Sequence, residues 1–189
     1  MKSSLRNMVL SLGCVSIAVA GLLAAVNSLT ADRIALNASM AETEAVATVM
    51  PRFANNPMAD TLTVDGCRIY PGRVDGRLTG AAVLVTTNEG FSGSLTIMVG
   101  FDAEGGLTDY SILESTETPG LGDKAAEWFR DPEGRHSVIG SRDELTVTKD
   151  GGNIDGITAA TITSRAFLGA VNRARAAFLK FSNQDNTAS

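Results

Sequence analysis

The sequence predicts an α+β protein in which a single N-terminal transmembrane helix precedes one folded domain. Three features support this prediction: an uncharged apolar stretch from Asn7 to Ala31, short β-rich runs after Thr61, and a helical pattern near the C-terminus. The chain has 189 residues, of which 44% are hydrophobic and 20% are charged. The part that follows the anchor is long enough for one domain of ordinary size, and it contains no internal repeat.

Charge and cysteine content exclude several functions. Lys2 and Arg6 precede the apolar stretch, which leaves 14 basic and 21 acidic residues and a net charge of −7 beyond it. A surface of this sign repels nucleic acid, so we expect no nucleic-acid partner. Cys14 and Cys67 are too few for a four-cysteine zinc or iron–sulfur site within this chain. The single histidine, His136, is expected at the surface of a loop rather than as a ligand.

Residues 1–30 are predicted to form a short cytoplasmic N-terminus and a transmembrane anchor. Met8–Val26 contains 19 mostly apolar residues. At about 1.5 Å per residue, a helix of this length nearly spans the ~30 Å hydrocarbon core. Lys2 and Arg6 flank its N-terminal side, so the positive-inside rule places the chain beyond Thr30 across the membrane.

Two other interpretations of the apolar segment stay open. Ala18-Val19-Ala20 is similar to a signal-peptide cleavage site. The apolar run continues to Val26, however, and this length favours a retained anchor. A lipoprotein signal ending at Cys14 would have too few apolar residues before the cysteine. The domain is exported under each interpretation.

Residues 31–60 are predicted to form a helical stalk. Ser28 and Thr30 are suitable caps for a helix that runs to about Val49 and is stopped by Pro51. The alanine, glutamate and methionine content of this segment favours a helix. A simple continuation of the anchor helix is an equal alternative.

Residues 61–181 are expected to form the domain. The period of two from Leu95 to Phe101 predicts a half-buried strand, and Leu107–Leu113 returns as its hairpin partner. The other predicted strands are Leu62–Val64, Cys67–Tyr70, Val83–Val85 and Glu144–Thr148.

Two helices are predicted in the second half of the domain. Asp123–Arg130 forms a short one, and its Trp128 is expected in the core, with stacking on a cofactor as the alternative. The second runs from Ile162 to about Phe181 and is followed by a polar tail, residues 182–189, that is expected to fray. Its apolar stripe consists of Ile162, Ala166, Ala170, Ala174 and Phe178.

The stretch Asp155–Ser164 (DGITAATITS) is the most informative part of the sequence. Its four hydroxyl residues follow the turn formers Gly151-Gly152-Asn153 and precede the last helix, a pattern typical of a helix start. A helix start presents unpaired backbone N–H groups and a positive dipole end, which favour a phosphate. For these residues alone, an ordinary threonine-rich cap is the alternative.

Glu117–Gly122 (ETPGLG) is a second motif, and its proline and two glycines alone indicate a turn. In this order, behind an anchor and a β-rich stretch, the two motifs resemble the FMN-binding domain found in the G subunit of the Rnf electron-transport complex. The resemblance covers most of the chain and is tightest from Phe91 to Ala174. The C subunit of the sodium-pumping NADH:quinone oxidoreductase is similar in the same region.

In that family, the last threonine of a Ser/Thr-Gly-Ala-Thr tetrapeptide carries FMN through a phosphoester. The matching tetrapeptide here is Thr158–Thr161, so the resemblance implies a covalent FMN on Thr161. Ala159 departs from the family glycine, which costs about 1 kcal/mol if the position requires a positive φ. Ser115 is a second departure, because many relatives have histidine there.

The two motifs supply the candidate cofactor-binding residues. Hydroxyl groups beside Thr161 can donate hydrogen bonds to the phosphate, with helix capping as the alternative role, and the ETPGLG loop is implied to lie against the flavin. Asp155 and Lys149 are weaker candidates, and no metal-ligating or catalytic residue is predicted. The full set of candidates is Thr161, Thr158, Ala160, Thr163, Ser164, Glu117, Thr118, Gly120, Leu121 and Gly122.

The resemblance implies a covalent-FMN electron-transfer subunit of a membrane-bound, ion-translocating oxidoreductase complex linked to ferredoxin and NAD. Its partners would be the other subunits of an Rnf-type complex and a flavin transferase for maturation. It would cross the bacterial inner membrane once, with its C-terminal domain in the periplasm. The alternatives are the corresponding FMN-binding subunit of the quinone oxidoreductase and a non-redox, membrane-anchored binding module.

Overall fold

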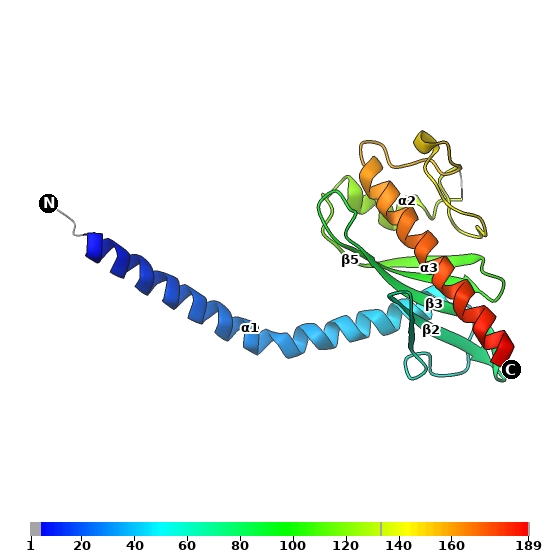
Figure 1. Cartoon of the computed structure of the whole chain (residues 1–189), viewed down its shortest axis with the longest axis horizontal. Helices are drawn as coiled ribbons and strands as arrows, with labels where there is room; N and C mark the ends of the chain where they lie inside the picture. The colour runs from blue at the N-terminus through cyan, green and yellow to red at the C-terminus, as the bar shows by residue number, and fades with distance from the viewer. Residues whose placement is uncertain (1–4, 133, 189) are drawn as a thin grey trace. The chain divides into compact units, whose positions relative to one another are not determined.

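The computed structural model describes residues 5–132 and 134–188. It divides the chain into two compact units, with the boundary between Ala41 and Glu42. The second unit contains an antiparallel sheet and a long C-terminal helix, which confirms the predicted α+β class (Figure 1).

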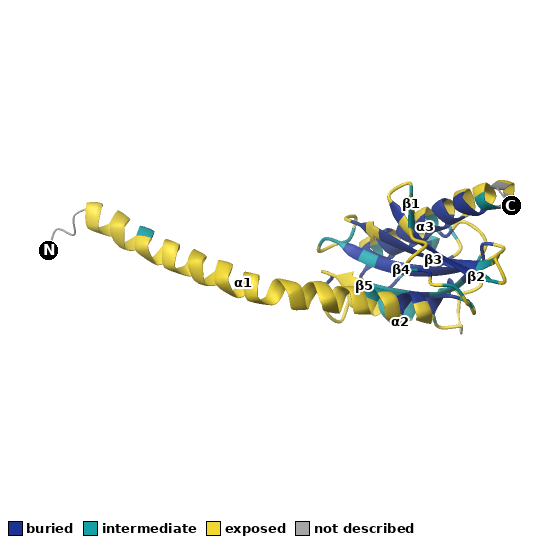
Figure 2. Ribbon diagram, turned by 90° about the horizontal axis from the view of Figure 1, so that it is seen from below, coloured by how far each residue is buried: buried dark blue, intermediate teal, exposed yellow. Residues whose placement is uncertain are grey.

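The first unit consists of most of helix α1, which runs without interruption from Leu5 to Val49. The predicted anchor and stalk are therefore one continuous helix, and it ends two residues before Pro51 as expected. Almost every side chain from Leu5 to Ala41 is exposed (Figure 2). Within the described part of the chain, α1 is the one helix that is long and apolar enough to cross a bilayer.

The sheet of the second unit is an antiparallel meander in which the strands pair in sequence order. The first two hairpins turn at Asp65-Gly66 and Asp75-Gly76, where all four residues have φ between 49° and 79°. Positive φ at both central residues gives a turn that matches the twist of the flanking strands. The strands are β1 Leu62–Val64, β2 Cys67–Val74, β3 Arg77–Thr87, β4 Leu95–Asp102 and β5 Leu107–Ser115.

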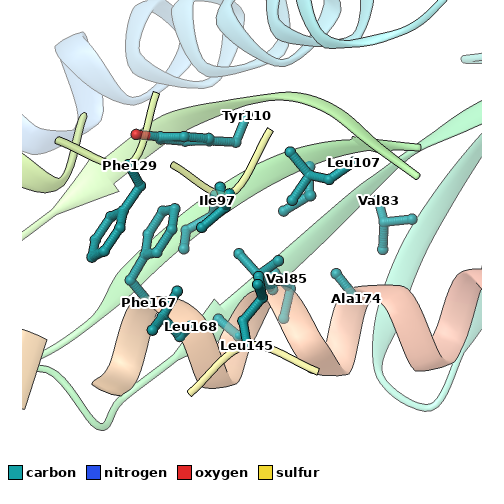
Figure 3. Packing of buried hydrophobic residues seen from close by; sticks show 14 of the residues in the cluster. Val83, Val85, Ile97, Leu107, Tyr110, Phe129, Leu145, Phe167, Leu168 and Ala174 are labelled. Atoms are coloured by element: carbon teal, nitrogen blue, oxygen red, sulfur yellow. The ribbon is translucent and has the colours of Figure 1, made fainter. Parts of the chain in front are cut away.

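Helix α3, Thr161–Ala188, covers one face of the sheet (Figure 1). Its buried side chains pack on those of the strands, and Figure 3 shows Val83, Val85 and Ile97 facing this helix. Phe167 stacks on Phe129 with ring centroids 4.6 Å apart. Tyr110 also packs on Phe167, so these three aromatic side chains form a group near the start of α3.

The last turns of α1 cover the opposite face of the sheet, within the second unit. Val46 and Val49 are buried against a cluster that includes Met98. The backbone at Gly100 approaches the carbonyl of Val49 so closely that no side chain fits there, and Thr108 Oγ1 donates to the same carbonyl at 2.5 Å. β4 is therefore buried on both faces, whereas its alternating pattern predicted a half-buried strand.

The predicted strand Glu144–Thr148 was wrong. Leu145 and Val147 are buried, but the segment contributes only an isolated bridge between Val147 and Ile154. The side-chain amide of Asn172 takes the place of a neighbouring strand, because it pairs with both the N–H and the carbonyl of Leu145 at 3.0 and 2.8 Å. Alternating burial here reflects a loop that is held against α3.

The two predicted helices are present with different bounds. The first is a 3-10 turn, η1 Gly122–Lys124, that continues into the one-turn helix α2, Ala125–Trp128. α3 extends to Ala188, so the expected fraying from Ser182 was wrong. Ser182 is buried, and Asp185 forms an ion pair with Arg73, which explains why the polar end stays helical.

Candidate functional site

The two sequence motifs meet at a pocket of about 170 Å³ in the second unit. Glu117, Thr118, Leu121 and Gly122 form one wall. The other wall consists of Ala159, Ala160, Thr161, Ile162 and Thr163, and Phe91 completes the lining. Residues about 40 positions apart in the sequence are thus brought together at the start of α3.

Glu117 is the buried acidic group of the pocket, with 7% of its surface exposed. Its Oε1 accepts the backbone N–H of Phe91 at 2.7 Å, whereas its Oε2 has no hydrogen-bond partner among the described residues. A buried carboxylate oxygen without a donor is unfavourable, so this atom is well placed to receive an N–H group from a ligand.

Gly122 is required by close packing beside this carboxylate. A methyl group on Gly122 would lie 2.7 Å from Glu117 Oε2 and 2.9 Å from Thr163 Oγ1. Thr118 accepts the backbone N–H groups of Leu121 and Gly122 through its carbonyl, both at 3.2 Å. The ETPGLG loop is therefore held in a tight turn against α3.

Thr161 is the first residue of α3 and is half-buried. Its position is fixed by Ser164, whose buried hydroxyl accepts the N–H of Ile157 and donates to the carbonyl of Ala160, both at 2.9 Å. Ser164 lines neither this pocket nor the second hollow described below. Its hydroxyl instead holds the preceding loop in place. Thr163 is buried inside the pocket wall, and Thr158 is exposed.

Ala159 has a left-handed backbone with φ of 64°. This is the position at which the family tetrapeptide has glycine, so the energetic cost of alanine at a positive φ applies in this chain. Gly120, in the other loop, has φ of 77°. Left-handed geometry is unfavourable for alanine by about 1 kcal/mol but carries no such penalty for glycine.

A second hollow, of about 360 Å³, shares Ala159 and Thr161 with the first. Lys149, Asp155 and Thr158 line it, and Lys149 Nζ donates to Thr161 Oγ1 at 3.0 Å. The sequence named Lys149 only as a weak candidate. The one signal in its favour was a basic residue in a glycine-containing turn shortly before the motif.

The turn that carries Lys149 is held to α3 by an ion pair between Asp150 and Arg165. Asp150 accepts two hydrogen bonds from Arg165, each of 2.7 Å. Hydrogen bonding to Arg165 holds the pKa of the Asp150 carboxyl below its ordinary value. Arg165 lies one turn after Thr161, so the Asp150–Arg165 pair and Thr161 belong to the same end of the helix.

Trp128 and His136 lie in a third hollow, of about 710 Å³, which only Gly120 links to the ETPGLG loop. The two rings stack with centroids 4.6 Å apart, and the indole N–H donates to the carbonyl of Asp155 at 3.0 Å. Trp128 is half-buried and packs against the core, as predicted, and His136 is half-buried rather than at the surface. Neither contacts the pocket that joins the two motifs.

The rim of the first pocket is apolar and exposed. Phe91, Leu121 and Ile162 have 68%, 40% and 47% of their surface exposed. Ile162 was predicted to belong to the buried stripe of α3, but it faces the pocket, whereas the other members of the stripe are buried. An apolar rim above a buried carboxylate suits a flat ring that carries N–H groups.

Ser115, at the end of β5, accepts the N–H of Glu117 at 3.2 Å through its hydroxyl.

Together, the apolar helix and this pocket define a membrane-anchored protein with an FMN-binding domain, because residues 90–176 match the FMN-binding domain family. Residues 1–49 match the RnfG N-terminal region. The chain belongs to the family formed by the G subunits of ion-translocating oxidoreductase complexes, which confirms the resemblance to the Rnf complex.

Three relatives illustrate the family, and each bears the name of the G subunit of an ion-translocating oxidoreductase complex. The Yersinia pestis protein is 33% identical over 92% of this chain and 90% of its own length. The Stutzerimonas stutzeri protein is 33% identical over 95% of this chain and 81% of its own. The protein of Escherichia coli strain K12 is 35% identical over 82% and 81%.

Proposed function

We propose that this chain is an electron-transfer subunit of a membrane-bound, ion-translocating oxidoreductase complex, and that it carries FMN as a phosphoester on Thr161. The observation that carries this proposal is the pocket formed jointly by Glu117–Gly122 and the first residues of α3, with Thr161 in its wall. Its natural partners are the other subunits of the complex and a flavin transferase.

The residues of the pocket fit an isoalloxazine ring. Phe91, Leu121 and Ile162 offer apolar contacts to a flat ring, and Glu117 Oε2 offers an acceptor to a ring N–H. Thr118 lies beside the carboxylate and supplies a further polar contact. When bound, FMN supplies one- and two-electron chemistry, while the protein fixes its position and tunes its potential.

The size of the pocket supports a carrier rather than an enzyme with an enclosed active site. Pockets that enclose a whole ligand usually measure about 300–1,000 Å³. This pocket holds about 170 Å³, which is too small to enclose a whole flavin, so part of a bound flavin would remain exposed. An exposed edge lets electrons pass to and from neighbouring subunits.

The start of α3 supports attachment at Thr161. Thr161 is half-buried and lines both hollows, and the backbone N–H groups at the start of the helix can bind a phosphate. Ester formation joins Thr161 Oγ1 to the phosphorus of an activated flavin nucleotide. The hydroxyl proton and the leaving group of that nucleotide are released, which is the work of a transferase. Thr158, Ala160 and Thr163 shape the surroundings, and Ser164 supports the loop.

The test of attachment is flavin fluorescence after denaturing gel electrophoresis of the full chain, coexpressed with its flavin transferase. We expect a fluorescent band for wild type, none for Thr161→Val, and an unchanged band for the matched control Thr187→Val, which alters an exposed threonine at the other end of α3. A dark wild-type band, or a fluorescent Thr161→Val band, would contradict the proposal.

We further propose that α1 crosses the bacterial inner membrane once and that the domain lies in the periplasm. Lys2 and Arg6 precede the apolar segment, which supports a cytoplasmic N-terminus. An enzyme reporter that is active only outside the cytoplasm, fused after Ser189, is expected to be active. An inactive fusion that is nevertheless made in full would reverse the orientation.

A further inference from the structure

The hydroxyl proposed for esterification already has a cationic neighbour. Lys149 Nζ donates to Thr161 Oγ1 at 3.0 Å across the second hollow. An ammonium group has three rotatable donors. A phosphorus atom bonded to Oγ1 would bring its free oxygens within reach of the same Nζ, without movement of the backbone.

The charges around the site make this neighbour important. Glu117 and Asp155, among the residues that line the two hollows, are acidic. Lys149 is the one cation among those lining residues, all of which belong to the described part of the chain. A phosphodiester adds one further negative charge. Without Lys149, three negative groups would therefore share the site with no opposing charge among the residues that line the two hollows.

The structure also keeps Lys149 available and in place. It lies in the turn η2, Thr148–Asp150, which is closed by the left-handed Gly151. Its neighbour Asp150 is neutralised by two hydrogen bonds from Arg165 and so does not compete for the ammonium group. Because Arg165 and Thr161 belong to the same end of α3, the Asp150–Arg165 pair holds the η2 turn beside Thr161.

We propose that Lys149 is the counter-ion of the phosphodiester on Thr161 and that the Asp150–Arg165 pair positions it. The inference rests on the proposed attachment of FMN and names the residue that makes the attached phosphate tolerable beside two carboxylates. Lys149 acts on the phosphate and not on the ring. Its removal thus affects the protein chiefly after flavin has been attached.

Differential scanning calorimetry of the detergent-solubilised full chain tests this proposal in a thermodynamic cycle. The cycle has the logic of a double-mutant cycle, with flavin attachment in place of the second mutation. Wild type and Lys149→Gln are each prepared with and without coexpressed flavin transferase. We expect the two unmodified proteins to melt together, and flavin-loaded Lys149→Gln to melt about 3 °C below flavin-loaded wild type. Lys149→Arg should restore most of the difference, and about 0.5 M salt should reduce it by screening.

The matched control is Lys180→Gln. Lys180 pairs with Asp65 and lies 19 residues beyond Thr161 on α3, roughly 28 Å along the helix axis. This substitution removes the same charge but should shift loaded and unmodified proteins equally.

The possible outcomes separate this inference from the proposed function. An equal shift in loaded and unmodified Lys149→Gln, or no shift in either, would overturn the role of Lys149 and leave the flavin proposal standing. Absence of flavin from wild type would overturn both. If Lys149→Gln folds like wild type but takes up no flavin, recovery of uptake in Lys149→Arg supports the inference, and failure to recover contradicts it.

Discussion

The two loops that form the pocket use the same backbone geometry with different residues. Gly120 and Ala159 both have a left-handed conformation, with φ of 77° and 64°, and both are exposed. The first loop has the residue that this conformation favours, and the second does not. The difference shows that the second loop holds Thr161 at the start of α3 against a local conformational penalty.

The compensation for this penalty lies in the contacts that surround Ala159. Ser164 ties the loop to the helix through two hydrogen bonds, and Ile157 is buried in the core. Strained residues persist where the surrounding structure determines their conformation. The geometry of the loop that precedes Thr161 is thus maintained by these contacts, whereas the ETPGLG loop is maintained by its glycines.

The largest expected effect comes from the glycine that is sterically required. Gly122→Ala would place a methyl group within 3 Å of Glu117 and Thr163, and overpacking of this kind destabilises by about 2 kcal/mol. We expect a thermal midpoint lower by several degrees, and reduced flavin fluorescence because the carboxylate is displaced. Scanning calorimetry and gel fluorescence measure the two effects.

Gly169→Ala is the control for this substitution. Gly169 lies in α3 with space around it, so the same added methyl should be neutral or slightly stabilising. If Gly122→Ala were as stable as Gly169→Ala, the ETPGLG loop would have to be looser than the structure indicates.

The sequence predicted most of the sheet, because strand periodicity and turn residues are local signals. β4 shows what local signals omit. The alternation from Leu95 to Phe101 identified one buried face, but Met98 on the other face is covered by Val46 and Val49, about 50 residues earlier. Nothing in the pattern of one strand specifies which segment covers it. Residues assigned to the stalk thus contribute to the domain core.

The site was predicted as two motifs, and the structure brings both into one pocket. The sequence indicated Lys149 only as a weak candidate, because its contact with Thr161 depends on the η2 turn and on the Asp150–Arg165 ion pair. Neither feature produces a periodic pattern in the sequence. The positive φ of Ala159 could not be predicted from the sequence either. A residue type indicates which conformations are favoured, but not which conformation tertiary contacts impose.

The smaller expected effect tests the comparison directly. Ala159→Gly should raise the free energy of unfolding by about 1 kcal/mol, because glycine adopts the left-handed conformation without the steric penalty. The reciprocal change Gly120→Ala should lower it by a similar amount, since a methyl group there meets no other atom within 4 Å and only the backbone term remains. Urea unfolding of the full chain, followed by Trp128 fluorescence before flavin attachment, measures both.

The two signs together decide whether the loops differ in conformation or only in sequence. Opposite shifts of similar size mean that both positions are left-handed and that Ala159 alone carries strain. If Ala159→Gly instead destabilises the chain, alanine must occupy an ordinary conformation in solution, and glycine then adds only flexibility. In that case the loop before Thr161 would have a different conformation in solution. Comparison of flavin-loaded and unmodified Lys149→Gln with wild type would then show whether Lys149 still lies beside Thr161.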